Sequence, residues 1–137
     1  MAHTIQRAEY YYTTVHDRPG EAFRFLSALG DIGVNLLAFT AMPVGVMQTQ
    51  LMIFPEDGPK LERQSARVGL EIEGPHGAIL VLGDDVPGAL VEIHETLYER
   101  NINVYASTGV TGGGGCYGYI IHVRPDDFEA AAEALGA

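Results

Sequence analysis

The chain has 137 residues, a net charge of −10 and one cysteine, and these numbers exclude several classes of protein. With 47% hydrophobic and 19% charged residues, the composition is typical of one ordinary globular domain or two very small ones. The acidity argues against binding to nucleic acid or to an anionic membrane surface, because both need clustered Lys and Arg. A small anion can still bind locally to backbone N–H groups.

The sequence indicates a soluble cytoplasmic protein. Cys116 has no second cysteine with which to form an intramolecular disulfide, which fits a reducing compartment. No apolar run approaches the roughly 18 residues of a transmembrane helix, and residues 1–7 lack an apolar signal core. The five histidines have no metal-binding spacing, so we expect neither a metal nor a cofactor.

The first half of the chain predicts strand, helix, strand, strand, helix, strand. In chain order the predicted elements are 9–15, a helix from Pro19 that Gly30 and Gly33 end, 34–41, 46–54, 61–68 and 70–73. Proline is tolerated in a first helical turn, which is why the helix is placed at Pro19. Strand alternation puts Tyr10 and Tyr12 on one face and Tyr11 on the other.

The second half predicts the same order with its last strand missing. The predicted elements are a strand over 78–82, a helix from Pro87, strands over 102–108 and 117–123, and a helix over 128–135. The glycine-rich stretch 108–118 is expected to be a hairpin loop, since no Lys follows it as in a phosphate-binding loop. The missing strand leaves an open edge, which either residues 4–8 or a second copy of the chain would cover.

A motif recurs at a fixed distance along the chain. Asp17-Arg18-Pro19-Gly20 returns as Asp85-Val86-Pro87-Gly88, an offset of 68 residues (85 − 17 = 68), and the same offset aligns 33–35 with 101–103. We therefore expect two units, 1–74 and 75–137, each of a size that is only marginally stable by itself. The predicted fold is α+β, with two ferredoxin-like β-α-β-β-α-β units in tandem and antiparallel sheets covered by helices on one face.

These residues resemble the ACT domain family. The family pattern is a strand, Asp-x-Pro-Gly before a helix, and then Gly-Val-Asn or Asn-Ile-Asn before the next strand, and both halves of the chain match it. The resemblance implies a regulatory module that binds a small ligand, typically an amino acid. It also implies that such domains pair side by side, with the ligand at an interface near the strand-to-helix loop.

The resemblance and the chemistry of the residues together define a candidate ligand site at both loops. Its residues are His16, Asp17, Arg18, Pro19, Gly20, Asn35, Asp84, Asp85, Pro87, Gly88 and Asn103. A helix N-terminus suits a carboxylate, the aspartates suit an ammonium group, and the asparagines both donate and accept hydrogen bonds. If only one loop binds, the first, with His16, Asp17 and Arg18, is the better amino-acid site, because the pair Asp84–Asp85 would repel a carboxylate unless a cation intervenes.

Simpler interpretations of these residues stay open. Asp17 and Asp85 are equally expected to act only as helix caps, and Asn35 and Asn103 as turn residues. His94 is expected to be a hydrogen-bonded core residue rather than a metal ligand.

The leading hypothesis is a stand-alone, non-enzymatic amino-acid sensor. It would form a homodimer and regulate an enzyme in trans. One alternative is a small enzyme on the same scaffold, with a catalytic group drawn from His16, Asp17, Asp84 and Cys116. The other is an interaction module that binds no ligand.

Overall fold

The computed structural model describes residues 3–137 and has an α+β fold. Its elements are β1 (His3–His16), α1 (Glu21–Asp31), β2 (Leu36–Pro43), β3 (Gln48–Pro55), α2 (Gly58–Val68), β4 (Glu73–Asp84), α3 (Val91–Glu99), β5 (Val104–Thr111), β6 (Cys116–Val123), the 3₁₀ helix η1 (Pro125–Asp127) and α4 (Phe128–Ala134). Among the described helices, none has the length and apolar character needed to cross a membrane.

The strands are hydrogen-bonded in the order β2-β3-β1-β4-β6-β5. The chain divides into two compact units, each with its own core. The first unit is Glu9–His76, and the second consists of the chain up to Ala8 together with Gly77–Ala137. The predicted boundaries, 1–74 and 75–137, stay a prediction, and the units seen in the structure differ from them chiefly in where residues up to Ala8 belong.

The first unit has the strand order of a ferredoxin-like sheet, β2-β3-β1-β4. Tyr11 lies opposite Ile53 on β3, and both are buried in a core with residues of α1 and α2. Tyr10 and Tyr12 extend to the other face, where each ring lies 5.2 Å from the ring of His76. The predicted alternation of the three tyrosines is therefore confirmed.

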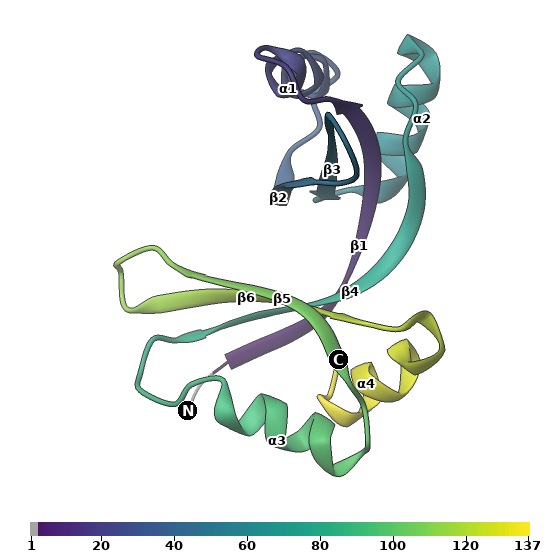
Figure 1. Cartoon of the computed structure of the whole chain (residues 1–137). Coiled ribbons are helices and arrows are strands. Elements are labelled where there is room, and N and C mark those ends of the chain that lie inside the picture. The colour runs from purple at the N-terminus through teal and green to yellow at the C-terminus, as the bar shows by residue number, and fades with distance from the viewer. Residues whose placement is uncertain (1–2) are drawn as a thin grey trace. The chain divides into compact units, whose positions relative to one another are not determined.

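The second unit combines β4, β5 and β6 with the first residues of β1. Ile5 of β1 packs against the core of this unit, and the Cβ of His3 lies 3.0 Å from where a side chain at Gly83 would begin. The helices α3 and α4 lie side by side in this unit (Figure 1). Residues 3–8 thus provide the fourth strand that the second half of the sequence lacks. Of the two predicted ways to cover the open edge, the structure shows the one that uses the N-terminal residues.

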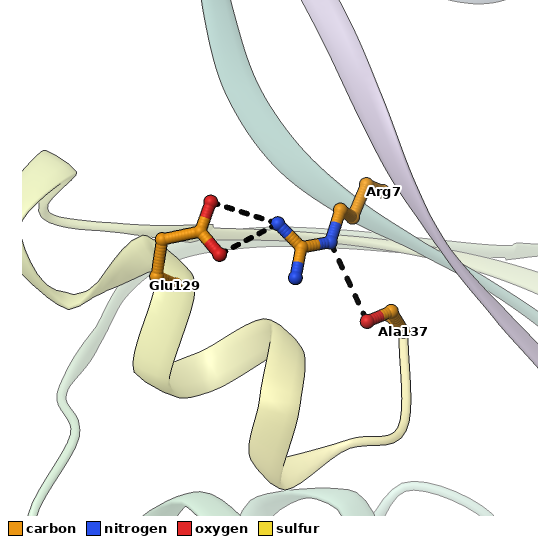
Figure 2. A network of polar contacts seen from close by, with 3 residues as sticks. All are labelled: Arg7, Glu129 and Ala137. Atoms are coloured by element: carbon orange, nitrogen blue, oxygen red, sulfur yellow. Dashed lines mark hydrogen bonds and ion pairs between the residues drawn. The ribbon is translucent and has the colours of Figure 1, made fainter.

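Arg7 fastens this added strand to the C-terminal helix (Figure 2). Its Nη1 donates to both carboxylate oxygens of Glu129, at 2.8 and 2.7 Å, and its Nε donates to the carbonyl of Ala137 at 3.4 Å. The guanidinium carbon also lies 5.8 Å from the centre of the Phe128 ring. One side chain therefore joins β1 to a segment more than 120 residues away in sequence.

Two predicted boundaries are wrong. No separate strand forms over 70–73, because residues 70–72 lie outside the strands and Glu73 begins β4, which contains the strand predicted over 78–82. The segment Gly-Pro-His-Gly at 74–77 continues β4 instead of turning. At Gly74 a Cβ would stand 2.6 Å from the ring of Tyr11 and 2.9 Å from the carbonyl of Tyr10, so the absence of a side chain lets the strands approach. The helices also begin after their prolines, at Glu21 and Val91.

Replacing Arg7 with Ala should lower the free energy of unfolding by about 1 kcal/mol, because a paired but partly exposed ion pair and a cation–π contact are lost. Urea unfolding followed by circular dichroism measures the change. Arg100→Ala, an exposed arginine at the end of α3, is the matched control and should change stability by less than about 0.5 kcal/mol. Equal effects of the two substitutions would contradict the fastening role of Arg7.

Candidate functional site

The two predicted loops have the same backbone geometry. The N–H of Asp17 donates to the carbonyl of Met47, and the N–H of Asp85 donates to the carbonyl of Gly115, both at 2.9 Å. Both acceptors lie in the hairpin turn of the same unit, between β2 and β3 or between β5 and β6. Each pair of bonded residues lies 68 positions from the other, so the offset found in the sequence extends to the tertiary contacts of the loops.

The unusual backbone angles repeat with the same offset. Gly20 and Gly88 have φ values of 90° and 77°, and the hairpin residues Met47 and Gly115 have φ values of 58° and 83°. Left-handed backbone is costly for any residue with a Cβ. The first unit nevertheless adopts the same left-handed backbone in its hairpin turn, although Met47 and not a glycine occupies the position there.

Asp17 and Asp85 do not cap the helices that follow them. The N-cap positions are Gly20 for α1 and Leu90 for α3, and within residues 3–137 neither cap position makes a side-chain hydrogen bond to its helix. By contrast, Asp57 does cap α2, accepting a 3.0 Å hydrogen bond from the N–H of Lys60. The predicted capping role of Asp17 and Asp85 is wrong, because each lies too far before the first helical turn.

The first loop carries an internal ion cluster. The Arg18 guanidinium donates two hydrogen bonds, of 3.1 and 2.6 Å, to Oε1 of Glu21, and Nη1 of Arg24 lies 3.5 Å from Oε2 of the same carboxylate. The hydrogen bond from Arg18 lowers the pKa of Glu21, and the charges of Arg18, Arg24 and His16 act in the same direction. The cations of this loop therefore surround a carboxylate of the protein itself.

The second loop borders a cavity of about 570 Å³. Asp85, Val86 and Gly88 form its wall on the loop side, and Leu90 and Val91 contribute the start of α3. Residues 109–111 of β5 and Tyr117 of β6 complete the lining. Of the predicted residues, Asp85 and Gly88 therefore line this cavity, whose walls are mainly apolar.

Tyr117 was not predicted as a site residue. It lines the cavity with only 8% of its surface exposed, and its hydroxyl has no hydrogen-bond partner among the described residues. Burial, followed by the charge of Asp84, raises the pKa of Tyr117, so the phenol stays protonated at neutral pH. Only the pairing of β6 with β4 brings Tyr117 beside Gly83, so the sequence contained no signal for its role.

Asn35 and Asn103 lie at the opposite ends of their strands from the two loops. On β3, His16 pairs with Gln48 whereas Leu36 pairs with Pro55, a separation of seven residues or about 23 Å. Asn35 instead donates to Oε2 of Glu56 at 2.9 Å. The second unit repeats the arrangement, and within neither unit does the structure bring the aspartate and the asparagine together.

The residues of the alternative catalytic group are divided between the units. Asp84 and the exposed Cys116 are paired neighbours on β4 and β6 of the second unit, whereas His16 and Asp17 belong to the first. His94 is hydrogen-bonded as predicted, its Nε2 lying 2.7 Å from the hydroxyl of the buried Tyr119. The prediction that His94 is a core residue is wrong, because this residue is exposed.

Known structures resemble this chain closely in fold, although no protein-family model and no curated protein matches its sequence. Protein BT0572 from Bacteroides thetaiotaomicron superposes with a TM-score of 0.79 at 15% identity, over 96% of this chain and 88% of that one. The ligand-free regulatory subunit of aspartate kinase from Thermus thermophilus gives 0.61 at 16% identity, over 98% and 94%. Aspartate kinase from Clostridium acetobutylicum, described as an allosteric enzyme, gives 0.55 at 20% identity, over 96% of this chain and 33% of that chain.

This chain shares the fold of that regulatory subunit. The predicted α+β, ferredoxin-like architecture is thereby confirmed. At such low sequence identities the likeness concerns the fold alone, and what the chain binds must be argued from its own residues.

Gly115→Ala should lower the free energy of unfolding by about 1 kcal/mol, because alanine is disfavoured at a φ of 83°. The matched control is Gly114→Ala in the same turn, which has no positive φ and, among the described residues, nothing within 4 Å of the added Cβ. Thermal unfolding of the two variants measures the difference. A control as unstable as Gly115→Ala would show that the left-handed backbone at 115 does not matter.

Proposed function

We propose that the protein is a non-enzymatic regulatory protein that binds a small molecule, and that its ligand is an amino acid. The cavity beside Asp85 and Gly88 carries the proposal. Its volume of about 570 Å³ lies within the range of ligand pockets, which are mainly apolar with a few polar groups. The loop-and-hairpin geometry supports a built site, because the hydrogen bond from Asp85 to Gly115 fixes one wall.

The lining of the cavity matches the parts of an amino acid. The carboxylate of Asp85 would accept hydrogen bonds from the ammonium group, and the positive end of the α3 dipole would attract the carboxylate. Val86, Leu90 and Val91 would contact the side chain. Such a site binds a zwitterion despite the net charge of −10, because it offers both signs of charge locally.

The proposed role is regulatory rather than catalytic. The similar structures include a regulatory subunit of aspartate kinase, which supports this proposal. We accordingly propose that the protein works in the cytoplasm and that ligand binding acts on an enzyme in trans. The repeated loops further support a tandem of two ACT-like units.

We also propose a homodimer formed through edge strands. The strands β2 and β5 end the strand order, and neither contains a charged residue. Edge strands in monomers usually carry charges that prevent pairing. Leu37 and Met42 of β2 are 45% and 53% exposed, and Tyr105 and Val110 of β5 are 56% and 70% exposed, so both edges present apolar surface.

Substitution of Val110 by Lys on β5 should convert a dimer to a monomer if β5 pairs, and Met42→Lys tests β2 in the same way. Size-exclusion chromatography with light scattering measures the molar mass. Val46→Lys, in the exposed hairpin turn outside both edge strands, is the control and should leave the dimer intact. A wild-type protein of 14.8 kDa in solution would contradict the homodimer.

Equilibrium binding of the twenty amino acids, followed by calorimetry, tests the proposed function. Val91→Glu places a carboxylate at the mouth of the cavity and should weaken binding at least tenfold. Its control is Phe23→Glu, the exposed residue 68 positions earlier in α1, which should bind like the wild type. Absence of binding to any amino acid would contradict the sensor role and favour a module that only pairs with other proteins.

A further inference from the structure

The two loops share a backbone but differ in charge at three equivalent positions. In the first unit, Arg18, Glu21 and Arg24 form the ion cluster around the Glu21 carboxylate. With the offset of 68, these positions become Val86, Ala89 and Glu92 in the second unit. The second loop therefore lacks the side chains that make the cluster, and the cavity lies beside Val86 and Ala89 instead.

We infer that the chain binds one amino acid, at the second loop alone and not at the first loop that the sequence favoured, because the cations of the first loop, Arg18 and Arg24, are already paired with the Glu21 carboxylate. This inference rests on the proposed function and deepens it, since it assigns the site to one unit and the ligand to a chemical class. That class is amino acids with an uncharged, apolar side chain.

The geometry of the first loop is the reason why we expect no ligand to bind there. The Glu21 side chain is only 15% exposed, whereas the side chains of Arg18 and Arg24 are 63% and 68% exposed. The carboxylate is thus held beneath the two guanidinium groups. A ligand carboxylate would have to displace an intramolecular partner, whose effective concentration is on the order of millimolar.

The residues that line the cavity at the second loop indicate the class of ligand. Among the described residues that line the cavity, Asp85 alone is charged, and its carboxylate would bind the ligand's ammonium group, so an acidic side chain would find no cation there. The cavity walls at Val86, Leu90 and Val91 offer apolar contacts instead. A basic side chain would leave its cation facing these walls, which favours an apolar side chain over a charged one.

Calorimetric titration of the full chain with L-valine, L-leucine, L-glutamate and L-lysine tests the inference. The expected result is one bound valine or leucine per chain, with glutamate and lysine at least tenfold weaker. Ala89→Glu copies the carboxylate of Glu21 into the second loop and should weaken binding at least tenfold. Glu21→Ala, the reverse change, should leave the affinity of the second loop within twofold.

A measurement on the wild-type protein tests the inference without relying on any variant to fold. In ¹⁵N-resolved NMR spectra, ligand should shift the amide signal of Gly88 and leave that of Gly20 in place. Two bound ligands per chain, shifts at Gly20 instead of Gly88, or tighter binding of glutamate would overturn the inference while the proposed function stands. If none of the twenty amino acids binds, the proposed function itself fails and the inference fails with it.

Discussion

The structure depends on one strand that contributes to two hydrophobic cores. Residues 3–8 of β1 belong to the second unit and residues from Glu9 onward to the first, so a single alternation of side chains must suit both. It does, because Ile5 and Tyr11 have the same parity and each is packed into the core of its own unit. A slip of one residue would move both sets to the wrong face of the sheet. The Arg7 hydrogen bonds to Glu129 and Ala137 hold the strand against such movement.

The loops show how a repeated backbone can serve two chemistries. Each is tied to its own hairpin through one N–H···O bond, and each contains a left-handed glycine. Backbone bonds do not depend on side-chain identity, so the side chains on this frame were free to diverge. In the first loop they form a closed ion cluster around Glu21, and in the second they leave an apolar cavity. The side chains, and not the shared backbone, therefore define the proposed ligand.

Much of the fold could be predicted from the sequence. Alternation identified the faces of Tyr10, Tyr11 and Tyr12, and the turn residues identified the hairpin at 112–115. The first residues of β4 escaped prediction, because Gly74 and Pro75 are turn residues by composition and only the close approach of Tyr11 explains the glycine. The predicted helix starts were also too early, because Pro19 and Pro87 precede the first turns of α1 and α3 instead of lying within them.

The sequence by itself determined the repeat, the α+β class and the two loops, because each rests on local preferences of glycine, proline and apolar residues at fixed spacing. Only the tertiary structure decided which side chains meet. The directions of paired strands carry Asn35 away from Asp17, bring Tyr117 beside Gly83, and join Arg7 to Glu129. These contacts connect residues far apart in the chain, and their geometry follows from strand register and helix packing, which no local pattern specifies.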